Sequence, residues 1–124
     1  MIPVLVYKNL HLIGVFMILV ALGGLILQQI KATTREQVWR KPVAITHGIG
    51  MVLALVGGFG MLARPELGII WPWPGWVIGK IIIWLVFGVL IALIGRAPAL
   101  AKPLWWTTIV LGAIAAYLAL NKPL

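Results

Sequence analysis

Three ionisable side chains, His11, His47 and Lys80, lie within otherwise apolar stretches of this 124-residue chain. A neutral histidine nitrogen can bind a metal ion or the iron of a haem, and a lysine ammonium can pair with an anionic group such as a propionate. Ionisable groups are costly inside a lipid bilayer, so where they occur they often mark a functional site. We therefore take His11, Lys80 and His47 as candidate cofactor-binding residues, and the two histidines as candidate metal ligands.

The apolar stretches around these residues predict helices that cross a membrane. Hydrophobic residues make up 63% of the chain and charged residues 10%, whereas a soluble domain carries roughly a quarter charged residues. Four segments approach the ~20 apolar residues that a spanning helix needs, at about residues 10–28, 42–63, 76–95 and 103–121. The sequence thus predicts an all-α fold in which residues 1–124 form a single integral membrane four-helix bundle.

The basic residues predict how this bundle is oriented. A four-span chain places both termini on the same side as its second loop, and its first and third loops on the other side. Six basic residues belong to the first and third loops and three to the side of the termini. By the positive-inside rule, the first and third loops face the cytoplasm and both termini lie outside. Contact with anionic lipid headgroups accounts for the net charge of +8, so no nucleic acid partner is expected. The six residues are Lys31, Arg35, Arg40, Lys41, Arg96 and Lys102, and the three are Lys8, Arg64 and Lys122.

The positions of the candidate residues along their helices predict which of them can act together. His11 and Lys80 each lie about one helical turn inside the outer end of a span, so at ~1.5 Å per residue they should share a similar depth and could face one another. His47 lies about one and a half turns in from the cytoplasmic end, which puts it well over ~10 Å from His11 along the normal of a ~30 Å hydrocarbon core. The two axial nitrogens of one haem iron are about 4 Å apart. We therefore expect His47 to be, at most, a second and independent ligand.

Each candidate also has a purely structural interpretation. A histidine near a helix end can hydrogen-bond a neighbouring carbonyl or hydroxyl group, and the Lys80 ammonium can extend past Trp76 and Trp84 to the lipid headgroups. Small residues at four-residue spacing let helices pack closely, either within one bundle or in a homodimer or a larger membrane complex. These small residues are Gly50, Ala54 and Gly58 in the second span, Gly88 and Ala92 in the third, and Thr108, Gly112 and Ala116 in the fourth.

Several catalytic classes are excluded because the chain lacks the residues they need. It has no cysteine and no serine, which excludes disulfides, thiolate metal sites, and cysteine or serine nucleophiles. Its two acidic residues, Glu36 and Glu66, fall in loops, so no carboxylate is available within the bilayer for the proton exchange of small multidrug antiporters. A protein that is not an enzyme is therefore favoured.

The layout of the chain resembles that of a known family. The segments YKNLHLIGV, KPVAITHG and WPGWVIGK lead into the first three spans, and the short fourth span ends in NKP. Over nearly the whole chain this pattern resembles the SirB family of small bacterial four-helix membrane proteins, which implies a location in the bacterial inner membrane.

A more distant resemblance concerns the candidate residues themselves. The first-span histidine and the third-span lysine are similar to functional residues of the HemJ-type protoporphyrinogen oxidases, which implies a porphyrin or haem b site at His11 and Lys80. The HemJ-type pattern has a further histidine about three turns after the lysine, where this chain has Leu90, Ile91 and Ala92. This departure counts against the oxidase activity more than against haem binding.

The sequence leaves two functional hypotheses. In the first, the protein binds haem or a porphyrin, with His11 as an axial ligand and Lys80 as the partner of an anionic group. The shared depth of these two residues supports it. In the second, the protein is a non-catalytic accessory or assembly subunit, which contacts a larger membrane complex through its small-residue stripes and tryptophans. The absence of a catalytic constellation supports that hypothesis.

Overall fold

The computed structural model describes residues 3–31, 39–64, 68 and 71–123, which form four long helices. Helix α1 spans Val4–Lys31, α2 spans Arg40–Leu62, α3 spans Gly75–Arg96 and α4 spans Ala101–Asn121, and a short 3-10 helix, η2 at Pro98–Leu100, precedes α4. All four long helices are apolar enough to cross a membrane, and the described residues contain no strand. The predicted all-α, four-helix membrane fold is confirmed.

A proline marks the beginning of each long helix. Pro3 and Pro74 directly precede α1 and α3, whereas Pro42 and Pro103 lie in the first turn of α2 and of α4. Proline is favoured in a first helical turn because the N–H that it lacks would have no partner within the helix. Helix α1 is longer than the span expected from about residue 10, since it begins at Val4. The helix therefore continues from the apolar segment into the polar residues that precede it.

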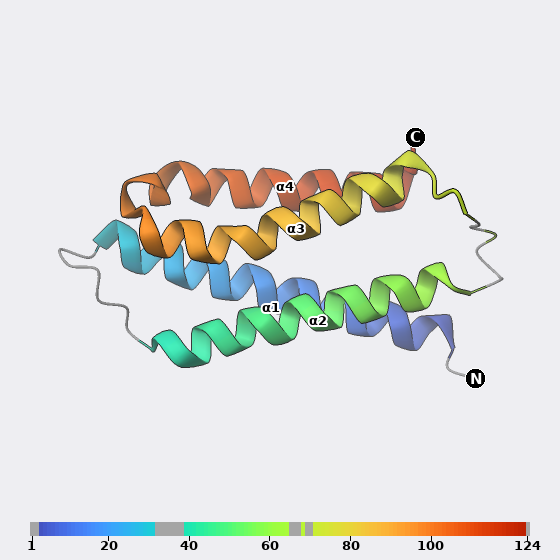
Figure 1. Cartoon of the computed structure of the whole chain (residues 1–124), viewed down its shortest axis with the longest axis horizontal. Coiled ribbons are helices and arrows are strands. Elements are labelled where there is room, and N and C mark those ends of the chain that lie inside the picture. The colour runs from blue at the N-terminus through green and yellow to red at the C-terminus, as the bar shows by residue number, and fades with distance from the viewer. Residues whose placement is uncertain (1–2, 32–38, 65–67, 69–70, 124) are drawn as a thin grey trace.

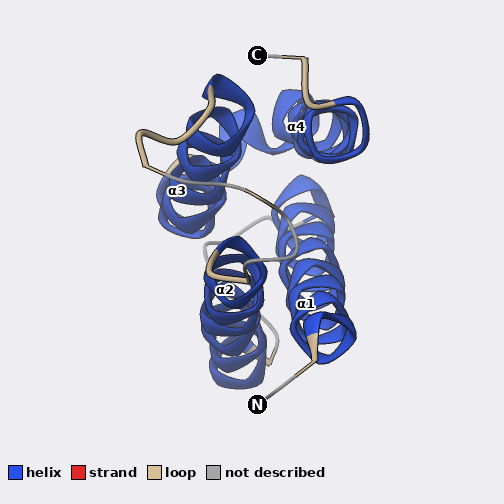
Figure 2. Cartoon of the chain, turned by 90° about the vertical axis from the view of Figure 1, so that its right-hand side faces the viewer, coloured by secondary structure: helices blue, strands red, loops and turns tan. Residues whose placement is uncertain are grey.

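Successive helices run in opposite directions along one bundle (Figure 1). The end of α1, the beginning of α2 and the helix η2 lie at one end of the bundle, which we call the loop end. The beginning of α1, the end of α2 and the end of α4 lie at the opposite end, the terminal end. Seen along its length, the bundle has α1 beside α2 and α3 beside α4 (Figure 2). Both chain ends thus share one side, as predicted, and the outward orientation of that side stays a prediction.

Glycines let α1 and α2 approach until their backbones touch. A Cβ atom at Gly50 would lie 2.8 Å from the carbonyl oxygen of Gly14, and a Cβ atom at Gly57 would lie 2.5 Å from the backbone nitrogen of His11. No side chain fits at such distances, so the close crossing of these helices depends on glycine at both positions. The predicted packing role of the small residues in the second span is confirmed for Gly50.

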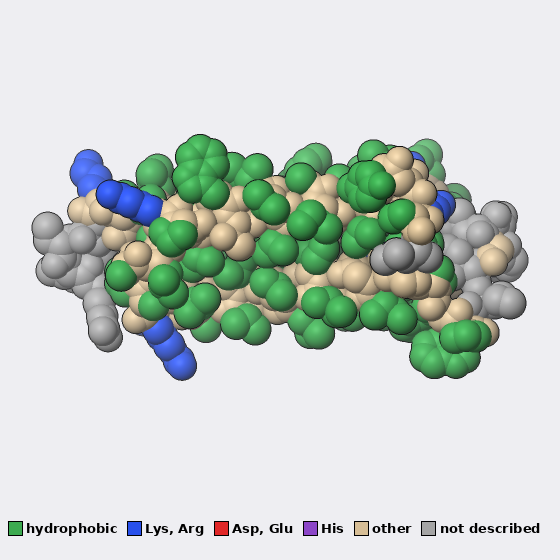
Figure 3. Space-filling model, turned by 90° about the horizontal axis from the view of Figure 1, so that it is seen from above, with side chains coloured by type: hydrophobic (Ala, Val, Ile, Leu, Met, Phe, Trp, Pro, Cys, Tyr) green, Lys and Arg blue, Asp and Glu red, His purple; other side chains and the backbone are tan. Residues whose placement is uncertain are grey.

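The core lies where the four helices meet, and the outer surface is largely apolar. Helices α1 and α3 contribute most of the large buried side chains, whereas α4 is the least buried of the four helices. Lys and Arg side chains lie at the two ends of the face shown in Figure 3, and hydrophobic side chains cover the length between them. This distribution suits a bundle whose middle is surrounded by lipid. The most deeply buried large side chains are Leu22, Ile26 and Ile94.

Candidate ligand-binding site

The His11 ring is held against α2 by a hydrogen bond to the backbone. Its Nδ1 lies 2.7 Å from the carbonyl oxygen of Ala54, and because a carbonyl oxygen only accepts, Nδ1 carries the hydrogen. Gly58, one turn further along α2, lies beside the ring, and a Cβ atom there would make an ordinary contact with Nδ1 at 3.4 Å. The glycines that bring α1 against α2 thus also fix the position of the imidazole.

This hydrogen bond leaves the second ring nitrogen of His11 available to a ligand. In a neutral imidazole with its hydrogen on Nδ1, Nε2 has a free lone pair. No described residue donates a hydrogen bond to Nε2. Histidines that bind a metal commonly donate their other N–H to a carbonyl or carboxylate, which orients the ring and makes the ligating nitrogen more basic. His11 therefore makes the carbonyl contact of its structural interpretation, as His47 does, while its Nε2 remains available to a ligand.

Lys80 lies near the beginning of α3, at the terminal end where α1 with His11 also begins. Its half-buried ammonium is within electrostatic range of the His11 ring and of Lys122, which follows α4. The Lys122 Nζ atom lies 5.4 Å from the centre of the Trp76 ring of α3. The two residues that the sequence places at one depth are thus within electrostatic range of each other, and Lys122 is a third basic residue at the same end.

These basic groups converge without a described negative charge between them. Lys80 makes no hydrogen bond or ion pair with a described residue. Both acidic residues of the chain, Glu36 and Glu66, lie outside the described residues. A carboxylate or phosphate among these groups would reduce their mutual repulsion and form charge-assisted hydrogen bonds. The site therefore combines a nitrogen lone pair with a preference for an anion.

His47 lies away from this site, in the contact between α2 and α3. Its side chain is 4% exposed, and its Nε2 donates to the carbonyl oxygen of Phe87 at 3.0 Å. The Trp84 indole makes a second bond between the same helices, donating from Nε1 to the carbonyl oxygen of Met51 at 3.0 Å. These bonds could not be predicted from the sequence, because their acceptors are backbone groups of another helix. The contact of His47 matches its structural interpretation, and a role as an independent ligand stays a prediction.

The two histidines lie too far apart for a single iron. His47 precedes Ala54 by seven residues and Gly58 by eleven on α2, and the His11 ring lies beside these two residues. At ~1.5 Å per residue the separation along the helix is about 10–17 Å. Within the described part of the chain, no three His, Asp or Glu side chains form a group that could hold a metal ion. A metal at His11 would therefore need other ligands, such as the four nitrogens of a porphyrin.

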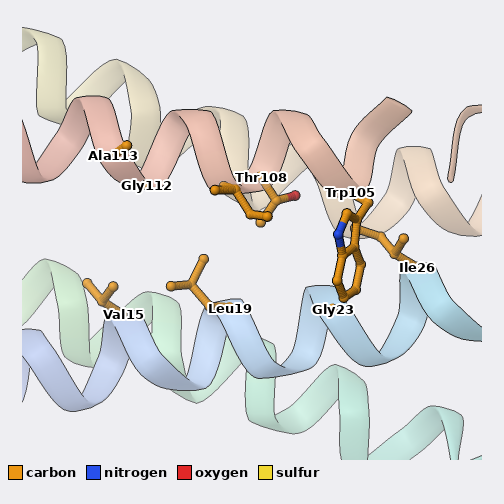
Figure 4. Close-up of a pocket in the computed structure, with 9 residues that line it drawn as sticks. Val15, Leu19, Gly23, Ile26, Trp105, Thr108, Gly112 and Ala113 are labelled. Atoms are coloured by element: carbon orange, nitrogen blue, oxygen red, sulfur yellow. The ribbon is translucent and has the colours of Figure 1, made fainter. Parts of the chain in front are cut away.

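A cavity of about 390 Å³ lies between α1 and α4 (Figure 4). Its lining is mostly apolar, and the hydroxyl of Thr108 already donates to the carbonyl oxygen of Leu104 in the same helix. Trp105 extends from α4 toward α1 beside Gly23, as Figure 4 shows. A Cβ atom at Gly112 would meet nothing within 4 Å, so this glycine does not serve helix packing within the bundle. The other lining residues are Val15, Leu19, Ile26, Ile109 and Ala113.

A second cavity, of about 330 Å³, lies at the loop end and is lined by residues of α1, α2 and α3. Arg40 and Arg96 contribute its charged groups. None of His11, Lys80 and His47 lines either of the two cavities. The apolar lining residues are Leu25, Val43, Ala44, Ile91, Ala92 and Gly95.

Comparison of the chain with protein-family models, with curated proteins and with solved structures finds no match. The resemblance to the SirB family and to the HemJ-type oxidases therefore stays a prediction.

Proposed function

We propose that this protein binds haem or a porphyrin at the terminal end of the bundle, with His11 Nε2 as the axial ligand of the iron and Lys80 paired with a propionate. One observation carries the proposal: the bond from His11 to Ala54 leaves Nε2 with a free lone pair, and the Lys80 ammonium is within electrostatic range of the same ring. The proposal includes a bacterial inner-membrane location with both termini outside. The excess of basic residues on the first and third loops supports that orientation.

The chemistry of haem fits the residues that are present. Haem iron needs an axial nitrogen, and the propionates need cationic partners. A bound haem b would supply a one-electron redox centre. The part of the protein is to bind the iron through His11, to orient the imidazole through the carbonyl of Ala54, and to neutralise a carboxylate at Lys80 with Lys122 nearby.

The resemblance to the HemJ-type oxidases supports the same two residues. It points to the first-span histidine and the third-span lysine, which are His11 and Lys80 here. This chain lacks the further histidine of that pattern, and Leu90 and Ile91 occupy the corresponding region. We therefore propose binding of the porphyrin and not its oxidation.

Absorption spectroscopy tests the proposal on protein purified in detergent from cells that were supplied with haem during expression. We expect a Soret band that sharpens on reduction with dithionite, with haem quantified per chain. His11→Ala should abolish this band, and His47→Ala should keep it, because His47 bonds to Phe87 away from the site. A colourless wild-type protein, or a band that survives in the His11→Ala variant, would overturn the proposal.

The role of Lys80 is tested separately by titrating the purified protein with iron-free protoporphyrin, which retains the propionates. Lys80→Gln should weaken binding about tenfold, because one charge-assisted contact is lost, and Lys80→Arg should restore most of it. Lys8→Gln is the matched control, since it removes the same charge from an exposed residue near the same end of the bundle. Equal losses in the Gln variants of Lys8 and Lys80 would mean that overall charge, and not a specific pair, attracts the ligand.

The cavity between α1 and α4 favours a second candidate function, docking of this bundle onto another membrane protein or a second copy. Gly112 faces the open space of this cavity, and small residues promote helix association in membranes. Gly112→Leu should release a co-purifying partner. Gly24→Leu is the control, because Gly24 also faces open space but does not line the cavity. Gly50→Leu would be a poor probe, since its side chain would collide with the backbone of Gly14.

A further inference from the structure

The cavity at the loop end has two guanidinium groups at helix ends. Arg40 is the first residue of α2 and Arg96 is the last residue of α3, and both line the cavity. Because α2 and α3 run in opposite directions, the beginning of α2 and the end of α3 both lie at the loop end. In a membrane-spanning helix, such terminal arginines lie at the level of the lipid headgroups. The cavity therefore extends from the headgroup region into the apolar part of the bundle.

The charges at this cavity have no described partner. Neither Arg40 nor Arg96 forms an ion pair or a hydrogen bond with a described side chain, and both are exposed. The N-cap residue of α2, Trp39, makes no capping hydrogen bond with its side chain. The beginning of α2 carries a partial positive charge and the end of α3 a partial negative one, so these helix ends offset each other and the two arginines supply the attraction for an anion. Glu36, the acidic residue nearest in sequence, lies outside the described residues.

The rest of the lining is apolar and made of small or branched side chains. Leu25 of α1, Val43 and Ala44 of α2, and Ile91 and Ala92 of α3 surround the space beneath the arginines. An inorganic anion would make no favourable contact with these apolar side chains, whereas the glycerol and first acyl carbons of a lipid would pack against them. The combination of two arginines above an apolar wall is complementary to a molecule with a phosphate at one end and hydrocarbon at the other.

We propose that this cavity binds an anionic phospholipid, with its phosphate between Arg40 and Arg96 and the beginning of its acyl chains against Leu25 and Ile91. The site is distinct from the proposed haem site, which lies at the opposite end of the bundle. Basic pockets between membrane helices are a common way of holding acidic lipid headgroups, and a guanidinium can contact two phosphate oxygens at once. The lipid would also link α2 to α3 at the loop end.

Native mass spectrometry of the full chain in detergent tests this site, with phosphatidylglycerol and phosphatidylcholine of identical acyl chains as probes. We expect retention of phosphatidylglycerol over phosphatidylcholine. The double variant Arg40→Gln, Arg96→Gln should bind phosphatidylglycerol at least about tenfold more weakly, the loss expected for a charge-assisted contact. The matched control is Lys41→Gln, Lys102→Gln, which removes two charges from exposed residues at the same end that do not line the cavity. Wild-type binding by the arginine variant, or an equal loss in the lysine variant, would refute the site.

A steric variant tests the cavity without changing any charge. Ala92→Phe would fill the space beneath the arginines, and because Ala92 is exposed the bundle should tolerate it. We expect loss of phosphatidylglycerol binding, whereas Ala99→Phe, at an exposed alanine outside the cavity, should bind as the wild type does. Undiminished binding by Ala92→Phe would refute the site. Displacement of phosphatidylglycerol by millimolar inorganic phosphate would show a free-anion site and would likewise refute a lipid site.

Discussion

The contact between α1 and α2 makes a quantitative prediction at Gly57, the glycine packed on His11. An alanine Cβ atom at Gly57 would lie 2.5 Å from the backbone nitrogen and 2.8 Å from the Cα atom of His11, whereas ordinary contacts begin at 3.4 Å. Both atoms belong to the backbone, so a rotamer change cannot relieve the clash. The two helices must separate, and overpacking of this kind costs about 1–3 kcal/mol.

Gly48 provides the matched control within the same helix. A Cβ atom there would meet nothing within 4 Å, so Gly48→Ala should only gain helix propensity, about 0.5–1 kcal/mol. Because Gly57→Ala gains the same helix propensity, we expect it to be less stable than Gly48→Ala by the overpacking cost alone, about 1–3 kcal/mol. The separation should also weaken the bond from His11 to Ala54, and with it the haem binding proposed above.

The free energy of unfolding of both variants can be measured in detergent by titration with a denaturing detergent, followed by circular dichroism. Haem content is measured on the same samples. If Gly57→Ala proved as stable as Gly48→Ala, the backbone contact of α1 with α2 would not exist as described. If it were destabilised but bound haem normally, the position of the His11 ring would not depend on this crossing.

Two further predictions concern polar groups in the core. His47→Leu removes the bond from His47 to Phe87 and should lower the free energy of unfolding by about 0.5–2 kcal/mol without altering haem content; lost haem with unchanged stability would contradict the structural role of His47. Gln29→Met replaces an amide that is 4% exposed and has no hydrogen-bond partner among the described residues. It should raise the free energy of unfolding in detergent by about 1–2 kcal/mol. A destabilised variant would instead reveal a water or ligand bound to the Gln29 amide.

The length of the apolar segments by itself determined that these segments are helices and how many helices the chain has. Within a bilayer the backbone must satisfy its own hydrogen bonds, so an apolar segment of ~20 residues has no alternative to a helix. Four such segments place both ends of the chain on one side, and the constant rise of a helix sets the depth of each residue. The shared depth of His11 and Lys80 followed from that rise, and the structure places the two side chains within electrostatic range of each other.

Only the tertiary structure decided which way each helix faces. The spans are apolar on every side, so no polar face marks the direction of the core, as it does in a soluble amphipathic helix. Rotation about the helix axis is set by packing, here by Gly50 and Gly57 on α2 against α1.

That rotation determines the chemistry of both histidines. It brings His11 Nδ1 to the carbonyl of Ala54 and leaves Nε2 free, while it buries His47 against Phe87. It also puts Arg40 and Arg96 on the wall of one cavity, although they belong to different helices. Hydrophobicity and helical rise are properties of one segment at a time, so the sequence determines spans and depths. Hydrogen-bond partners and cavities depend on pairs of helices, so they exist only once the bundle has packed.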